Sequence, residues 1–227
     1  MAFYRREYFS NADRRARARQ QSARLGENAR PVVIEGIQIV KSFWGKAWCQ
    51  HLESFSDYAN RLPRGRTYVR NGSVCHLDIQ AGVIQAQVSG THLYEVRLEV
   101  KPLLQPVWEQ IKTGCVGQVA SLLELLEGRL SDQVLRVVTD RRQGLFPQPS
   151  EIQLNCNCPD WASMCKHVAA VLYGVGHRLD SQPDLLFVLR QVDPMELFTN
   201  LTGARPGGRQ LPDDRLSQIF GIDLLLD

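Results

Sequence analysis

The sequence predicts an α+β protein: an antiparallel β-meander with packed helices, followed by a ββα-like metal-binding module and C-terminal helices. Three observations lead to this prediction. Apolar residues recur at helical steps of three and four before residue 60 and again after residue 102, and they alternate with polar residues in between. Three cysteines and one histidine gather within residues 156–167. A further apolar pattern of helical period follows them directly.

The composition is that of an ordinary soluble globular protein. The chain has 227 residues, of which 44% are hydrophobic and 22% charged, and it is long enough for one or two domains with a substantial core. Its start lacks the apolar segment of a secretory signal, and no run approaches the roughly 18 apolar residues of a membrane span, so we expect a cytoplasmic protein with no membrane partner. The single cysteines Cys49, Cys75 and Cys115 are expected to be reduced core thiols.

Positive charge is concentrated at the N-terminus. Residues 1–30 hold eight arginines against three acidic residues, whereas the net charge of the whole chain is only +3, so the rest of the chain is slightly negative. Few large apolar residues accompany these arginines, and we expect residues 1–30 to be a basic flexible arm. This arm is either a solvated tail or a segment that lies against phosphates.

The remaining chain divides into three parts. Residues 31–140 are expected to form an α+β domain with a helix, a four-stranded antiparallel sheet and further helices. Residues 141–201 are expected to hold the metal module and the helices that follow it. Residues 202–227 are expected to be a linker with an apolar C-terminal tail, which either tucks onto the core or docks on a partner.

Local patterns place the elements of the first half. Ser42 is expected to cap an amphipathic helix over residues 42–60, whose aromatic stripe is more typical of a core than of a stacking platform. Asn71-Gly72 is expected to be a hairpin turn, because both residues tolerate positive φ. The expected strands are Thr67–Arg70, Val74–Ile79, Val83–Val88 and Leu93–Val100.

Helices are expected again after residue 102. Pro106 is typical of a helix start, Gly128 of a helix end, and Ser131 of the cap of another helix. Beyond the metal module, two short helices are expected at Pro183–Leu189 and Pro194–Leu201.

The cysteine-histidine cluster is the strongest functional signal. Cys156, Cys158, Cys165 and His167 follow a C-x-C-x6-C-x-H pattern. Three thiolates and one imidazole fill a tetrahedral zinc shell and leave no open position for water or substrate, so they predict one structural Zn²⁺. Cys165 is expected at or just before a helix start and His167 in its first turn, since residues two apart do not share a helix face. The alternatives are buried free thiols or a strained disulfide between Cys156 and Cys158.

The stretch Cys156–Tyr173 resembles a SWIM zinc finger, and the four ligands match the pattern of that finger residue by residue. Phe43–Trp48, Arg64–Val74 and Asp193–Phe198 also resemble stretches of bacterial SWIM-finger proteins. The resemblance implies a zinc-binding module for contacts with DNA or protein. Because such proteins in bacteria often accompany helicase-like ATPases of the Swi/Snf type, the resemblance also implies a partner of that kind.

Catalytic signatures are missing from the sequence, which has no phosphate loop, no H-E-x-x-H, no G-x-S-x-G and no dinucleotide-binding fingerprint. Asp160 in the metal loop suits a turn cap better than a general base. We therefore expect a protein that is not an enzyme and has no small-molecule substrate. The alternative is a nuclease- or transposase-related enzyme that uses the finger to bind DNA, although the sequence shows no carboxylate cluster for that chemistry.

Two binding functions remain open: contact with nucleic acid, and docking onto a helicase-like ATPase. Lys166 lies between two ligands at an expected helix N-terminus, where backbone N–H groups attract phosphate. The other candidates for phosphate contact are arginines near the metal module, near the first expected strand and in the arm: Arg141, Arg142, Arg64, Arg66, Arg70, Arg14, Arg15, Arg17 and Arg19. For the three arginines between residues 64 and 70, the alternative to phosphate contact is a solvated position at the rim of the sheet. Contacts with phosphates would be sequence-nonspecific, and DNA is the expected ligand.

Overall fold

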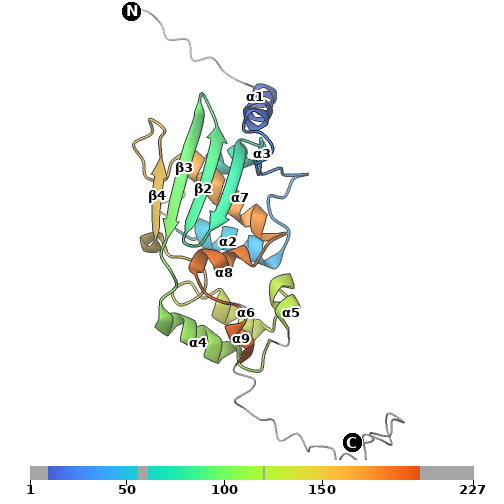
Figure 1. Ribbon diagram of the computed structural model, residues 1–227, viewed down its shortest axis with the longest axis vertical. Coiled ribbons are helices and arrows are strands. Elements are labelled where there is room, and N and C mark those ends of the chain that lie inside the picture. The colour runs from blue at the N-terminus through green and yellow to red at the C-terminus, as the bar shows by residue number, and fades with distance from the viewer. Residues whose placement is uncertain (1–9, 56–60, 120, 200–227) are drawn as a thin grey trace, which may run out of the picture.

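The computed structural model describes residues 10–55, 61–119 and 121–199 and confirms the α+β class. Helices cover one face of a four-stranded antiparallel sheet, the other face is open, and a layer of shorter helices lies beyond one end of the sheet (Figure 1). The expected linker and tail at residues 202–227 lie outside the described residues, as does the end of the expected aromatic stripe, Tyr58–Ala59.

The sheet has the strand order β1-β2-β3-β4, and every neighbouring pair is antiparallel. The predicted alternation is confirmed in β3, where every second residue from Tyr94 to Val100 is buried. The last strand comes from the metal module, since Leu154 of β4 pairs with Leu98 of β3. The module and the meander therefore share one sheet. The strands are β1 (Val74–Gln80), β2 (Val83–Ser89), β3 (Leu93–Val100) and β4 (Ile152–Cys156).

The predicted strand Thr67–Arg70 is wrong, because these residues end helix α3 (Leu62–Arg70). The run Thr-Tyr-Val favours a strand locally. The helix, however, has a proline in its first turn and buries Leu62, Gly65 and Val69 at helical spacing. Packing of this stripe against helix α7 (Lys166–Leu179) overrides the local preference.

The predicted hairpin turn at Asn71-Gly72 is also wrong. Asn71 is the C-cap of α3, and Gly72, with a φ of +68°, leads the chain into β1. A residue that tolerates positive φ is as typical of a helix end as of a hairpin, so the local signal alone does not distinguish the two.

The basic N-terminal segment is not a flexible arm over its described part, because it forms helix α1 (Asn11–Arg24). A reciprocal capping box between Ser10 and Asp13 starts this helix. The helix lies against β1: the Cys75 thiol donates to the Ala18 carbonyl at 3.5 Å, and the Ser22 hydroxyl donates to the Cys75 carbonyl at 3.4 Å. The lack of large apolar residues does not prevent a helix here, because arginine and alanine both favour helix. The small Ala18 is the one fully buried residue of α1.

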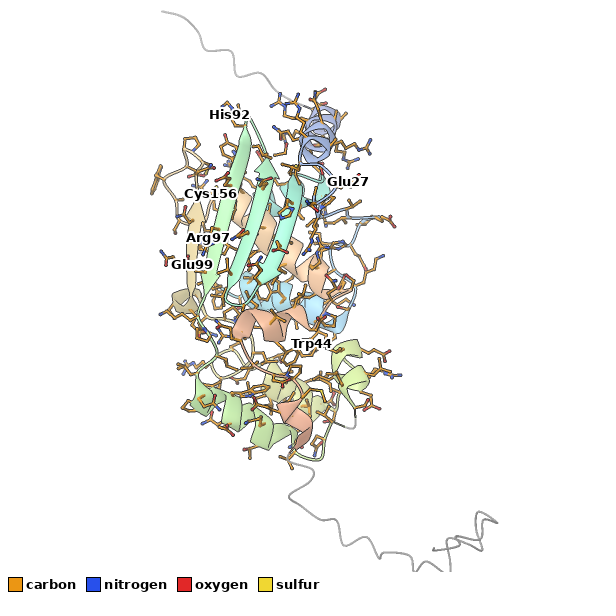
Figure 2. All side chains as sticks on the ribbon, viewed as in Figure 1. Glu27, Trp44, His92, Arg97, Glu99 and Cys156 are labelled. Carbon is orange, nitrogen blue, oxygen red and sulfur yellow. The ribbon has the colours of Figure 1, made fainter. Side chains whose placement is uncertain are left out.

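Helix α2 (Phe43–Glu53) begins at the predicted cap, Ser42, whose hydroxyl accepts from the Gly45 N–H at 3.1 Å. Its aromatic stripe belongs to the core, as expected. Trp44 and Trp48 are at most 1% exposed, and their indole N–H groups donate to backbone carbonyls at 2.9 and 2.8 Å. Trp44 lies where the sheet-bearing part of the molecule meets the layer of shorter helices (Figure 2).

Helix α7 is the centre of the core, with buried residues all around its circumference. Two glycines allow its neighbours to approach closely. A methyl group at Gly65 of α3 would lie 2.5 Å from the Ala169 Cβ, and one at Gly45 of α2 would clash with Asp180 and lie 2.7 Å from the Gly176 carbonyl oxygen. Both glycines therefore serve the position of α7.

The layer of shorter helices confirms the predicted start at Pro106, the end at Gly128 and the cap at Ser131. Trp108 and Lys112 of the first helix both bind Glu196 of the last, at 3.1 and 2.8 Å. The helices are α4 (Gln105–Cys115), α5 (Leu122–Glu127), α6 (Asp132–Val138), α8 (Leu185–Arg190) and α9 (Glu196–Thr199), and a 3₁₀ turn (Pro149–Glu151) precedes β4. Among the described residues, no helix has the length and apolarity required to cross a membrane.

The close contact between α3 and α7 predicts a large difference between two glycine replacements. Gly65→Ala places a methyl group against the backbone and Cβ of Ala169, so we expect unfolding free energy to fall by about 1 to 3 kcal/mol. In Gly174→Ala, the nearest atom is a side-chain methyl of Val32 at 3.2 Å, which can move. Both replacements bring the same gain in helix propensity, so equal melting curves for the two variants would contradict the account.

Candidate metal centre and basic surface

The four predicted ligands come from three consecutive elements of the structure. Cys156 ends β4 opposite Val96 of β3, and Cys158 lies two residues further along the loop. Cys165 is the N-cap of α7, with its sulfur accepting from the Val168 N–H at 3.4 Å, and His167 lies in the first turn. The predicted placement of the last two ligands is confirmed.

The ligand atoms lie at distances that suit a tetrahedral ion. All four are within 4.8 Å of one another. The Nδ1 atom of His167 lies 3.8 Å from the Cys156 sulfur and 3.9 Å from the Cys165 sulfur. Zn–S and Zn–N bonds of about 2.3 and 2.0 Å in a tetrahedron give edges of about 3.5 to 3.8 Å, so the ligands need little movement to hold Zn²⁺.

The three neighbouring thiols shift one another's pKa values. Hydrogen bonding from Cys156, and also from His167 and the Val168 N–H, lowers the pKa of the Cys165 thiol to about 4. The same contact and burial raise the pKa of the Cys156 thiol, and burial raises that of Cys158. Without a bound cation, these directions favour a state in which Cys165 alone is deprotonated. A zinc ion supplies the positive charge with which all three are deprotonated.

Two tyrosines fix the ring of His167. Tyr94 of β3 stacks on it with ring centroids 4.3 Å apart, and Tyr68 of α3 meets it edge-on at 5.4 Å. The other ring nitrogen, Nε2, is buried without a hydrogen-bond partner among the described residues, and a methyl group at Gly90 would lie 3.2 Å from it. Nothing in the sequence marks these three neighbours as part of the site, because they are distant along the chain and carry no metal-ligand signal of their own.

The loop between Cys158 and Cys165 is held to α3. Asp160 accepts from the Ala162 N–H at 3.3 Å and pairs with the Arg61 guanidinium at 3.4 Å. This supports its predicted use in holding the loop backbone. The next residue, Trp161, is 94% exposed. The sequence analysis assigned no function to it.

Several predicted phosphate contacts come together around Tyr68. Lys166 of α7 lies with its Nζ 5.6 Å from the centre of the Tyr68 ring. Arg14 and Arg17 of α1 line, together with Tyr68, a hollow of about 110 Å³. Arg64 lies one turn before Tyr68 on α3 and is exposed. These residues, Lys166, Arg14, Arg17, Arg64 and Tyr68, are called the basic surface below.

The other candidates lie elsewhere. Arg15, Arg19 and Arg70 line a separate hollow of about 710 Å³ between α1 and the segment that precedes α2. Arg66 is already paired, because its guanidinium bonds Glu53 at 2.6 Å and donates to the Tyr173 hydroxyl at 2.7 Å.

Arg141 and Arg142 are exposed in the turn that follows α6, in the layer of shorter helices, whereas α1 and α3 lie at the opposite end of the molecule (Figure 1). The tertiary structure therefore separates these two arginines from the basic surface.

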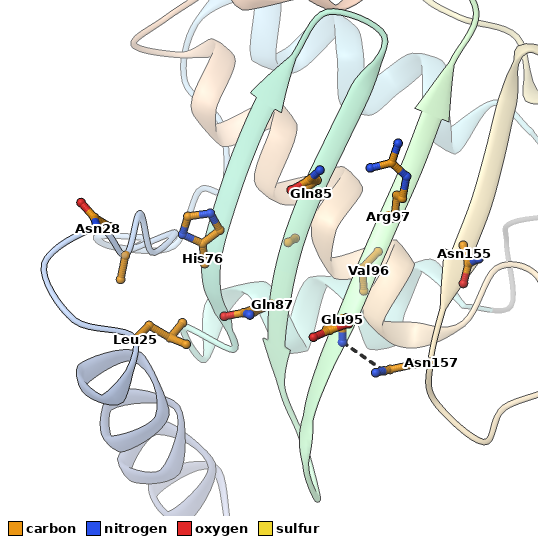
Figure 3. Close-up of a pocket in the computed structure, with 12 residues that line it drawn as sticks. Leu25, Asn28, His76, Gln85, Gln87, Glu95, Val96, Arg97, Asn155 and Asn157 are labelled. Carbon is orange, nitrogen blue, oxygen red and sulfur yellow. Dashed lines mark hydrogen bonds between the residues drawn. The ribbon is translucent and has the colours of Figure 1, made fainter.

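The open face of the sheet has a different chemistry. A hollow of about 680 Å³ lies there, and five of its twelve lining residues are carboxamides, among them Gln85, Gln87 and Asn155 (Figure 3). Its charges are mixed: Arg97 lies on the same face as Glu95 and pairs with Glu99 at 2.9 Å (Figure 2). This face therefore offers no excess of positive charge to a nucleic acid.

The ligand assignment predicts the metal content of two cysteine variants. Cys165→Ser removes one sulfur ligand, so we expect bound zinc to fall well below one ion per chain by elemental analysis. Cys115→Ser is the matched control, because Cys115 is equally buried but lies outside the cluster. In hydrogen exchange, the first variant should lose protection in the loop 157–164, while α7 stays protected by its own packing. Equal zinc contents in the two variants would contradict the assignment.

Comparison with known proteins agrees with the geometry. Residues 140–175, which contain all four ligands, match the family model of the SWIM zinc finger. The chain is also similar to the uncharacterized protein Rv2102 of Mycobacterium tuberculosis, with 29% identity over 184 residues that make up 80% of this chain and 66% of that protein. No solved structure matches the chain significantly. The protein therefore carries a SWIM zinc finger at residues 140–175 and is a zinc-binding protein.

Proposed function

We propose that the protein binds nucleic acid through the basic surface and has no catalytic activity of its own. The observation that carries the proposal is the meeting of cationic side chains from α1, α3 and the zinc-bearing helix α7 around Tyr68. These three helices are far apart in the sequence, and their meeting requires the whole fold.

The position of Lys166 strengthens this proposal. It occupies the first position of a 14-residue helix, where the helix dipole favours an anion, and its own charge adds to that effect. Arg14 and Arg17 line the hollow beside Tyr68, and the Lys166 ammonium lies 5.6 Å from the centre of the same ring. Asp13 also lines this hollow, but it accepts two hydrogen bonds from Ser10, and its pKa is lowered mainly by that contact. The surface keeps an excess of positive charge.

The zinc centre acts in this proposal as a structural support. Four protein ligands fill the coordination shell of the ion, so no position is open for a substrate or a reactive water. His167 contacts Tyr68, and Lys166 is its neighbour in the chain, so zinc binding fixes the part of the basic surface that α7 provides. Contacts with phosphates position a protein without reading base sequence, which makes the proposed binding sequence-nonspecific.

The proposal predicts a change in the salt dependence of DNA binding. In the triple variant Arg14→Ala, Arg64→Ala and Lys166→Ala, we expect weaker binding by fluorescence anisotropy. The slope of log affinity against log salt should become shallower by about 2 to 3, because each of the three lost phosphate contacts removes about 0.7 to 0.9 from it.

The control is the pair Arg141→Ala and Arg142→Ala, which removes two exposed charges in the layer of shorter helices. Its slope should equal that of the unmodified protein. An equally shallow slope in both variants would show that net charge, and not the basic surface, determines binding.

A second candidate function, docking onto a helicase-like ATPase, is favoured by the layer of shorter helices. Among the described residues, five of the eight exposed large apolar side chains lie in or beside these helices: Leu104, Val116, Leu123, Val188 and Met195. The basic surface lies at the other end of the molecule, so both contacts are compatible in one complex.

Docking can be tested by affinity capture from the native cytosol after nuclease treatment. We expect a helicase-like ATPase to be retained by the unmodified chain and lost with Leu104→Glu and Leu123→Glu, because a charge at either position opposes burial in an interface. The basic-surface triple variant should still retain the ATPase. Loss of the ATPase on nuclease treatment of the unmodified chain would mean that nucleic acid alone connects the two proteins.

A further inference from the structure

Trp161 differs from the other tryptophans of this protein. The chain has four, and Trp44, Trp48 and Trp108 are at most 1% exposed, whereas Trp161 is 94% exposed. Large aromatic side chains are the main contributors to protein cores, so an indole left almost wholly in water serves no packing purpose in the described fold.

The loop that carries Trp161 is held at several points. The residue lies between the zinc ligands Cys158 and Cys165, so the ion closes a short loop around it. Its neighbour Asp160 bonds the Ala162 N–H within the loop and pairs with Arg61 at the start of α3. An aromatic ring presented on a restrained loop loses less conformational entropy on binding than one on a free loop.

Cationic residues lie on the segments that flank this loop. Arg61 is tied to the loop, Arg64 is exposed one turn further along α3, and Lys166 directly follows the ligand Cys165. An exposed indole beside cationic side chains is the combination with which proteins hold single-stranded nucleic acid, with bases stacked on aromatic rings and phosphates near the cations. Bases inside a duplex are stacked on both faces, so only the terminal pairs offer a face to such a ring.

We propose that Trp161 stacks on an unpaired nucleobase, so that the preferred ligand of this protein is single-stranded nucleic acid. The inference rests on the proposed nucleic-acid binding and specifies its ligand class. The phosphates adjacent to the stacked base lie toward Arg64 and Lys166, which continues the path to Tyr68 and α1.

Tryptophan fluorescence provides the test, because Trp161 is the exposed fluorophore and the three buried indoles emit at shorter wavelength. The zinc-loaded full-length chain is titrated with a mixed-sequence 12-nucleotide DNA strand and, separately, with its blunt duplex. We expect the long-wavelength emission to be quenched by the single strand and much less by the duplex. In Trp161→Ala, single-strand affinity by anisotropy should fall by about 5- to 150-fold, the range for the loss of one stacked base.

Two further variants make the result specific. Trp161→Phe keeps an aromatic face and should recover most of the single-strand affinity, although it removes the emission. Ile37→Ala shortens another exposed apolar side chain, one that is 87% exposed in the segment before α2, and should bind as the unmodified chain does. Zinc content and melting temperature should be unchanged in all three variants, since none of these side chains is packed in the core.

The outcomes separate this inference from the proposed function. If Trp161→Ala binds the single strand as tightly as the unmodified chain, the stacking assignment fails while nucleic-acid binding stands. Equal affinity for strand and duplex, with no quenching, likewise overturns the assignment. If the unmodified chain binds neither form, the proposed function itself fails. If Trp161→Ala loses only the captured ATPase, the indole is a protein-docking residue and the inference is wrong.

Discussion

The structure depends on the close packing of α7 against α2 and α3. Gly65 lets α3 approach Ala169, and Gly45 lets α2 approach Asp180 and Gly176. At either position a side chain would force the helices apart. Asp180 also accepts from the backbone N–H and hydroxyl of Ser42 and so holds the start of α2. Because α7 is fixed along its length, its first turn arrives beside the end of β4. The zinc site requires this juxtaposition.

The metal site and the sheet support each other. Cys156 is a residue of the β3–β4 ladder, and the ladder continues past it, with the Asn157 side chain accepting from the Glu95 N–H at 3.0 Å. On the other side, Tyr94 of β3 stacks on His167. Zinc therefore links a strand edge to a helix start that already lie together, and its binding free energy adds to the packing of α7.

The same arrangement brings the cationic side chains together. Sequence patterns indicate arginine-rich segments but not which of them share a surface. In the fold, Arg14 and Lys166 both lie beside Tyr68, Arg66 is paired with Glu53, and Arg141 follows α6, a helix at the end of the molecule opposite α1. Phosphates bind best where several positive charges lie close together. Which cationic side chains lie close together is decided by the tertiary structure.

The sequence by itself determined the four zinc ligands, the placement of Cys165 and His167 at a helix start, the strands β1 to β3 and the helix caps at Ser42, Gly128 and Ser131, because ligand spacing, alternation and caps are local. Tertiary structure decided the rest. Thr67–Arg70 became helix because Gly65 fits against α7, and the arginine-rich start became α1 because Ala18 packs on β1. In both cases the contact that stabilises the helix comes from a distant part of the chain, and local propensity does not include such contacts.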